Sequence, residues 1–144
     1  MPVNSILSAK GRSVVTAAPG DTVAEVAGLL ASKRIGAVVI AGPKGTIEGI
    51  VSERDVVQAV AERGAAALSL KAREVMTHPV QTCSPHDTED ALMSLMTTKR
   101  IRHVPVVQDG KLCGMISIGD VVKFRIEAIE RESDEMKAYI SSAG

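Results

Sequence analysis

Hydrophobic and polar positions alternate along the chain in an order that occurs twice. From residue 23 onward, apolar residues recur at helical spacing, and this pattern predicts an amphipathic helix that begins near Asp21. Two short runs rich in β-branched residues follow, Ala37–Ile40 and Ile47–Val51. They are separated by a Gly-Pro-Lys-Gly turn and therefore predict two paired strands.

The second half of the chain carries the same pattern. A helix is predicted to begin near Asp87, although Glu89 stands where the first copy has a valine. Val104–Val107 and Leu112–Ile116 predict a second pair of strands. Asp109-Gly110 lies between them, and Asp-Gly between apolar runs is a strong signal for a hairpin.

Comparison of the chain with itself reveals an internal duplication. Val15–Thr22 matches Gln81–Thr88 at an offset of 66 residues, and Gly49–Val57 matches Gly114–Val122 at an offset of 65. Each copy has the order strand, helix, strand, strand, helix. One copy is too small to bury both its sheet and its helices. The chain is therefore predicted to be an α/β protein with two tandem β-α-β-β-α repeats, packed sheet against sheet about a pseudo-twofold axis.

This interpretation divides the chain into repeat one (1–66), repeat two (67–126) and a C-terminal helical extension (127–144). Apolar residues on the predicted last helix recur at alternating spacings of four and three, a heptad-like seam interrupted by one serine. The seam positions are Val122, Ile126, Ile129, Ser133, Met136 and Ile140. Two alternatives remain open, packing of this helix on its own domain and pairing with a second protomer.

Composition narrows the function classes. Lys and Arg number 17, as do Asp and Glu, so no overall basic field attracts nucleic acid or an anionic membrane. Aromatic residues make up 1% of the chain, too few for stacking with single-stranded nucleic acid. The longest apolar run is too short to cross a bilayer, and residues 1–15 lack the apolar core of a signal peptide. We expect a soluble, cytoplasmic protein.

Two Ser-x-x-Asp motifs lie where each second hairpin strand leads into a helix. They are Ser52 with Asp55 and Ser117 with Asp120. This spacing is typical of a capping box, in which both side chains only stabilise the helix start. A carboxylate fixed there can also accept hydrogen bonds from the vicinal hydroxyls of a ribose, and the helix N-terminus favours a phosphate.

Basic residues cluster at Lys99-Arg100 and Arg102-His103, just before a predicted strand. Cations at a helix C-terminus explain Lys99 and Arg100. They explain Arg102 and His103 less well, and the first copy has Gly36 and Ala37 at these two positions. A solvated helix end and an asymmetric anion site are both consistent with this cluster.

Catalytic and metal motifs are weak in this sequence. Cys83 and His86, with His78 nearby, form an incomplete set of zinc ligands. Neither a nucleophile–base arrangement nor a glycine-rich phosphate loop stands out. We therefore expect no enzymatic activity and no catalytic cofactor or metal.

Several ordered motifs together resemble a known family. Each copy has a Thr-x-x-Pro opening and an Asp-Thr pair before its first helix. Each also has an Arg-Ile pair before its first hairpin strand and ends in Gly-Ile-Val-Ser-x-x-Asp or Gly-Met-Ile-Ser-x-x-Asp. Val-Pro-Val-Val at 104–107 also fits. Each copy resembles a CBS domain (named for cystathionine β-synthase), and the pair resembles a Bateman module over residues 3–126.

The resemblance implies a regulatory function. CBS pairs bind adenosyl ligands such as AMP, ADP, ATP, S-adenosylmethionine or NAD(H), modulate another protein and tend to form homodimers. For this chain it implies a stand-alone nucleotide sensor with an unknown partner protein. The alternative is a ligand-free interaction scaffold whose clefts are vestigial.

The resemblance also implies a set of ligand-binding residues. Asp55 and Asp120 would hold ribose, with Ser52 and Ser117 close by. Arg54 and the basic residues at the start of the second hairpin would meet phosphate. The adenine pockets would be lined by Thr16, Ile35, Gly36 and Ala37 in one copy and by Thr82 in the other. One expected cleft joins Thr16, Gly36 and Ala37 to Arg102, His103, Ser117 and Asp120. The other joins Thr82 to Ser52, Arg54 and Asp55.

Overall fold

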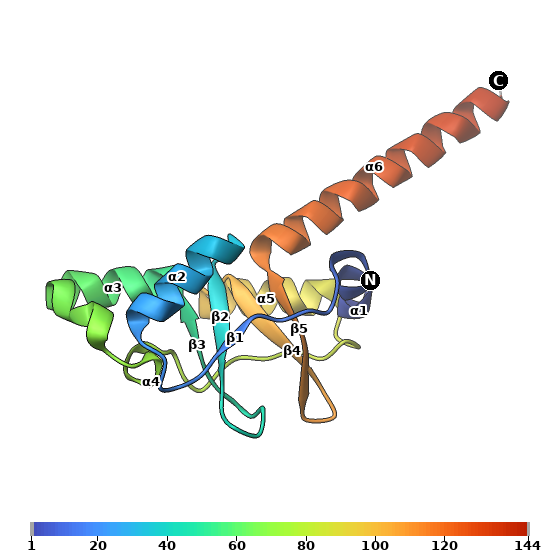
Figure 1. Ribbon diagram of the computed structural model, residues 1–144. Helices are drawn as coiled ribbons and strands as arrows, with labels where there is room; N and C mark the ends of the chain where they lie inside the picture. Colours follow the sequence, from blue (N-terminus) through green and yellow to red (C-terminus); the bar gives the residue numbers. More distant parts are fainter. Residues whose placement is uncertain (1, 144) are drawn as a thin grey trace.

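The computed structural model describes residues 2–143 as an α/β body from which one long helix projects (Figure 1). The strands lie in the middle of the body, with α3 and α4 towards one end and α1 at the other (Figure 1). In chain order, the elements are α1 (Val3–Lys10), β1 (Thr16–Ala17), α2 (Val23–Lys33), β2 (Ala37–Ala41), β3 (Ile47–Ser52), α3 (Glu53–Arg63), η1 (Gly64–Ser69), α4 (Ala72–Val75), α5 (Glu89–Lys99), β4 (His103–Gln108), β5 (Lys111–Ser117) and α6 (Ile118–Ala143).

Each repeat contributes its own small sheet, and the predicted hairpins are confirmed. In repeat one, β1 pairs parallel with β2, and β2 pairs antiparallel with β3. In repeat two, β4 pairs antiparallel with β5, and the counterpart of β1 is reduced to a parallel bridge between Cys83 and Val106. Asp109 and Gly110 both have positive φ (53° and 75°), the conformation that a tight two-residue hairpin turn requires.

The Asp-Thr pairs start the first helix of each repeat. Thr22 and Thr88 occupy the N-cap positions, and their hydroxyls accept hydrogen bonds from the amides of Glu25 and Ala91. Asp21 accepts a hydrogen bond from an amide of the preceding turn, as Asp87 does in repeat two. Both residues of each pair therefore serve the same local purpose, which is to end a turn and begin a helix.

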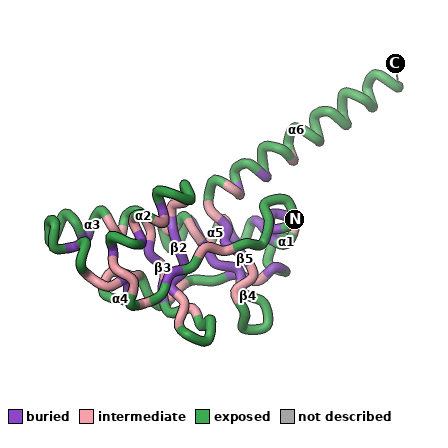
Figure 2. Tube along the Cα trace, in the orientation of Figure 1, coloured by how far each residue is buried: buried purple, intermediate pink, exposed green. Residues whose placement is uncertain are grey.

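Two apolar clusters form the core, one in each repeat (Figure 2). The cluster of repeat two includes Val3, Ile6 and Leu7 of α1, although α1 precedes repeat one in the chain. The cluster of repeat one includes Ala72 of α4, which follows repeat one. The repeats thus exchange their leading segments, an arrangement that the division of the chain at residue 66 did not anticipate.

Equivalent contacts show that this exchange follows the pseudo-twofold relation of the repeats. A Cβ built on Gly114 of β5 would collide with Leu7, and a Cβ built on Gly49 of β3 would collide with Met76. Each leading segment therefore lies directly over a glycine of the sheet that it covers. The repeat pattern predicted the strands and the main helices, but it did not predict α1, η1 or α4.

The predicted C-terminal helix is a single α-helix of 26 residues that begins within repeat two. Its first turns contact α1, α5 and β5, and Val121 and Phe124 enter the core. Beyond these turns it extends away from the body (Figure 1), and Ile129, Met136 and Ile140 are exposed. The first turns of α6 pack on their own domain, but the exposed seam residues beyond them do not.

Candidate functional site

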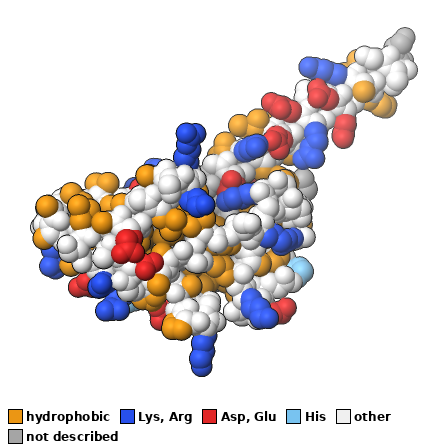
Figure 3. Space-filling model, in the orientation of Figure 1, with side chains coloured by type: hydrophobic (Ala, Val, Ile, Leu, Met, Phe, Trp, Pro, Cys, Tyr) orange, Lys and Arg blue, Asp and Glu red, His pale blue; other side chains and the backbone are white. Residues whose placement is uncertain are grey.

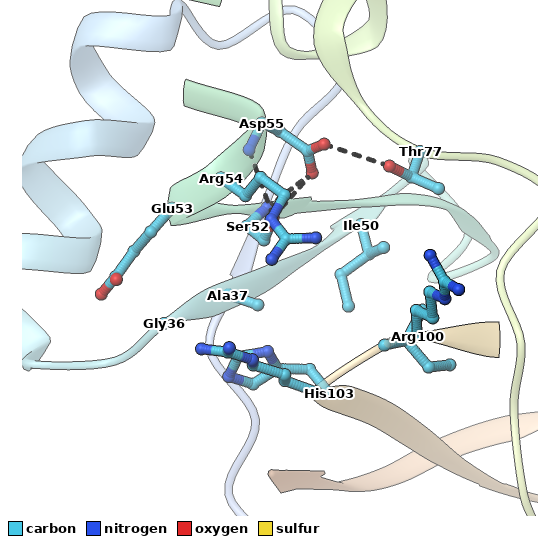
Figure 4. Close-up of a pocket in the computed structure, with 12 residues that line it drawn as sticks. Gly36, Ala37, Ile50, Ser52, Glu53, Arg54, Asp55, Thr77, Arg100 and His103 are labelled. Atoms are coloured by element: carbon cyan, nitrogen blue, oxygen red, sulfur yellow. Dashed lines mark hydrogen bonds between the residues drawn. The ribbon is translucent and has the colours of Figure 1, made fainter. Parts of the chain in front are cut away.

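A cavity of about 300 Å³ lies between the two repeats (Figure 4). This volume is at the lower end of the range for small-molecule sites. Its walls come from the N-terminal turn of α3, the adjoining ends of β2 and β3, the segment after α4, and the entrance to β4. The lining residues are Gly36, Ala37, Ile50, Ser52, Glu53, Arg54, Asp55, Thr77, Arg100, Ile101, Arg102 and His103.

The N-terminus of α3 forms the acidic wall of this cavity. Ser52 and Asp55 make the predicted capping box: the Asp55 amide donates to the Ser52 hydroxyl (3.3 Å), and the Ser52 amide donates to Asp55 Oδ2 (2.8 Å). The other carboxylate oxygen, Oδ1, accepts a hydrogen bond from the Thr77 hydroxyl at 3.2 Å. The Glu53 amide donates to the Gly36 carbonyl at 2.9 Å, so the start of β2 lies beside the helix N-terminus.

Cationic side chains face this wall from both repeats. Arg54 extends from α3 into the cavity, and Arg100 extends towards it from the other repeat (Figure 4). Arg100 ends α5 in the left-handed conformation, with φ 55°. Arg102 and His103 follow it at the start of β4. The cavity thus combines three guanidinium groups with the positive end of the α3 dipole, an arrangement that favours an anion.

His103 reaches across the boundary between the repeats to Gly36. A Cβ built on Gly36 would lie 2.9 Å from both Cε1 and Nε2 of the His103 ring, so only glycine permits this approach. Burial lowers the pKa of His103, and the nearby charge of Lys10 lowers it further. The imidazole is therefore held more in its neutral form than an exposed histidine at the same pH.

The equivalent group in repeat two is arranged differently. Ser117 and Asp120 also form reciprocal hydrogen bonds at the start of α6. Here, however, the ammonium of Lys10 lies 2.6 Å from Asp120 Oδ2 and donates a second hydrogen bond to the Met115 carbonyl. Burial opposes ionisation of Asp120, but the hydrogen bonds from Lys10 and Ser117 outweigh it and lower the pKa.

Seven of the predicted ligand-binding residues line this cavity, and they come from both expected clefts. Arg102 and His103 were expected beside Ser117 and Asp120, and His103 does pair with Ser117 across the hairpin. Both residues also line the cavity that contains Ser52 and Asp55, a grouping that was not expected. In each repeat the start of the first hairpin strand lies beside the second helix, because the amides of Glu53 and Ile118 donate to the carbonyls of Gly36 and Arg102. The other predicted residues lie outside this cavity: Thr16, Ile35, Thr82, Ser117 and Asp120.

Five lining residues were not in the predicted set, namely Ile50, Glu53, Thr77, Arg100 and Ile101. Arg100 was explained by the helix end alone. Thr77 had a signal, because Val75-Met76-Thr77 introduces the second repeat and fits the family pattern. The bridge between Thr77 and Ile50 brings this segment back to β3, and a tertiary contact of this kind leaves no local signature.

Two other features bear on the chemistry available to the chain. Burial and the nearby charges of Asp87 and Cys113 raise the pKa of the Cys83 thiol to about 12. Within residues 2–143, no three side chains of His, Cys, Asp or Glu gather in a way that could hold a metal ion. In the same part of the chain, no helix is long and apolar enough to span a membrane.

Comparison with known proteins identifies close relatives. The family model of the CBS domain matches residues 9–62 and 72–127. The crystal structure of a CBS-domain containing protein from Agrobacterium tumefaciens, ATU1752, is 48% identical and has a TM-score of 0.84, over 86% of this chain and 92% of that one. A CBS domain protein from Pyrobaculum aerophilum, solved in complex with AMP, is 30% identical with a TM-score of 0.74, over 83% of this chain and 89% of that one. The mitochondrial protein CBSX3 of Arabidopsis thaliana is 31% identical over 96% of this chain and 71% of its own length.

Proposed function

Because this chain belongs to the CBS domain family, we propose that it is a regulatory module that binds an adenine nucleotide and catalyses no reaction. The candidate ligands are AMP, ADP, ATP and NAD(H). In this proposal the protein acts in the cytoplasm as a homodimer, and nucleotide binding changes how it regulates a separate partner protein.

One observation carries the proposal: a single cavity joins a fixed carboxylate to a group of cations. Asp55 is held at the start of α3 and can accept hydrogen bonds from ribose hydroxyls. Arg54, Arg100 and Arg102 lie around the same space and suit phosphate oxygens. Ile50, Ala37 and Ile101 supply apolar surface for a base. The relative solved with AMP supports an adenosyl ligand.

The contrast between Asp55 and Asp120 points to one ligand site per chain. Asp55 shares the cavity with cations but forms no ion pair within residues 2–143, whereas Asp120 is paired with Lys10. A ribose at Asp120 would have to compete with that ammonium group. We therefore expect nucleotide to bind at Asp55 and not at Asp120.

Titration calorimetry on two matched variants tests this proposal. Asp55→Asn and Asp120→Asn each weaken an equivalent helix cap, and Asp120→Asn also removes the ion pair with Lys10, so Asp120→Asn has the larger structural cost. We expect the wild-type chain to bind about one AMP or ATP, Asp55→Asn to weaken binding at least tenfold, and Asp120→Asn to change it less than threefold. Equal losses in the two variants would contradict the single-site assignment.

Mass spectrometry of small molecules released by denaturation gives an independent test. A stoichiometric adenine nucleotide would identify the ligand class directly. If no nucleotide is released and none binds in titration, the sensor proposal fails. The ligand-free interaction scaffold would then be the better proposal for this chain.

A further inference from the structure

The part of α6 that projects from the body carries an apolar seam that no other element of residues 2–143 covers. Ile126, Ile129, Met136 and Ile140 are each at least half exposed, and Tyr139 lies beside the seam at 70%. Figure 3 shows hydrophobic and charged side chains next to one another along this helix. An apolar stripe of this length on a solvated helix usually marks a binding surface.

The seam and the core-facing side of α6 are different faces of the helix. Successive residues of an α-helix are rotated by about 100°. Val121 is fully buried, whereas Val122 next to it is 47% exposed and begins the seam. Attachment of α6 to its own body therefore leaves the seam open to another helix.

Charges beside the seam distinguish two ways of pairing it with a second copy. With Ile126 and Ser133 at heptad position a, Glu130 and Lys137 occupy e and Glu132 occupies g. In a parallel, in-register pair, Glu132 faces Lys137 of the other copy, five residues further on, which is an attractive contact. In the antiparallel pair that sets Ser133 against Ile129, Glu130 faces Glu130 and Glu132 faces Glu132, which is repulsive.

Ser133 favours the same parallel arrangement. It is the one polar residue among the six seam positions and lies near the middle of the exposed part. In a parallel, in-register pair the two serines lie opposite each other. In an antiparallel pair each serine would lie against Ile129 of the other copy. A polar residue at a single a position is a known device for fixing register.

We propose that α6 pairs with α6 of a second copy of this chain as a short, parallel, in-register coiled coil centred near Ser133. This inference rests on the homodimer in the proposed function and does not depend on the nucleotide. It places the two bodies at the same end of the helical pair.

Disulfide trapping tests the geometry directly. We would prepare Ser133→Cys, with Ala138→Cys on the opposite face of the same helix as the control, both in a Cys113→Ser background. Cα atoms must lie within about 4.4–6.8 Å for a disulfide to form. Under mild oxidation we expect Ser133→Cys to give at least fivefold more linked dimer than Ala138→Cys. Equal yields would overturn the proposal.

A second pair of variants keeps the test independent of that cysteine. In the Ser133→Cys chain, Ile129→Glu should lower the yield of linked dimer at least fivefold, whereas Ala138→Glu should leave it unchanged. Both sites are exposed, so neither change affects the core. Analytical ultracentrifugation separates the two proposals. A dimer that Ser133→Cys does not link would retain the homodimer and overturn this interface, and a monomer at high concentration would overturn both.

Discussion

Gly36 lets the two repeats share one cavity. Gly36 has no side chain, so the ring of His103 can lie against the start of β2. The Gly36 carbonyl still accepts a hydrogen bond from the Glu53 amide at the start of α3. The first copy of the duplication thus supplies space where the second supplies charge. This asymmetry distinguishes the cavity at Asp55 from the group around Asp120.

Gly36→Ala should therefore weaken nucleotide binding with little effect on folding. The new methyl group would lie 2.9 Å from Cε1 and Nε2 of the His103 ring. This distance is too short, so the ring would move into the cavity. We expect about tenfold weaker binding, equivalent to about 1.4 kcal/mol, when measured by titration calorimetry. Gly20→Ala is the control, because a Cβ at Gly20 meets no atom within 4 Å. Equal affinities for the two variants would disprove this role of Gly36.

His103 should make the stability of the protein depend on pH. Its pKa in the folded state is lowered from 6.5, so the unfolded chain takes up a proton first as the pH falls. The free energy of unfolding should therefore decrease as the pH is lowered from 7.5 to 5.5. Urea titrations at both pH values should show a smaller decrease for His103→Gln than for wild type. His86→Gln, which changes an exposed histidine, should behave like wild type.

Between elements, a buried carboxylate joins α5 to α6. Glu89 is buried at the start of α5, where repeat one has a valine, and its carboxylate accepts a hydrogen bond from Arg125 Nε at 2.7 Å. Arg125 also contacts Asp90 at 3.0 Å. Glu89 interrupts the apolar pattern of α5 because its carboxylate pairs with Arg125 on α6.

Arg125→Ala should lower the midpoint of thermal unfolding by several degrees, because it leaves the Glu89 carboxylate buried without its partner. Restoring the valine of repeat one should compensate, so the double variant Glu89→Val with Arg125→Ala should regain most of that loss. Differential scanning calorimetry measures both effects. If the double variant is no more stable than Arg125→Ala alone, burial of Glu89 is not the cause.

Elements set by neighbouring residues could be predicted from the sequence, and contacts set by packing could not. The capping box of Ser52 and Asp55 and the hairpin turn at Asp109-Gly110 depend on residues a few positions apart. The placement of His103 against Gly36 depends on the rotation between the repeats. The ion pair of Lys10 with Asp120 joins residues 110 positions apart, so no local sequence pattern predicts it.

At the scale of the whole molecule, the exchanged leading segments tie each repeat to a stretch of chain outside it. Val3 and Leu7 of α1 are fully buried in repeat two, and Ala72 of α4 is fully buried in repeat one. Neither repeat, taken at the boundary that the duplication suggests, contains its complete core. The two repeats should therefore unfold together.

Leu7→Ala tests this dependence. Truncation of a fully buried leucine leaves a cavity and costs about 2–5 kcal/mol. Met76→Ala, at the equivalent place over repeat one, should cost less because Met76 is only partly buried. Urea unfolding followed by circular dichroism should show one transition shifted to lower urea in Leu7→Ala. Two separate transitions would show that the repeats unfold independently.

The exchange also has a consequence for the order in which the chain acquires its structure on the ribosome. α1 is synthesised well before β5, since Lys10 and its partner Met115 are 105 residues apart. At about 5–20 residues per second, roughly 5–20 s pass before that sheet exists. During this interval Val3, Ile6 and Leu7 have no surface to pack on. Nascent chains should therefore depend on chaperones at this stage, and translation speed should influence the yield of folded protein.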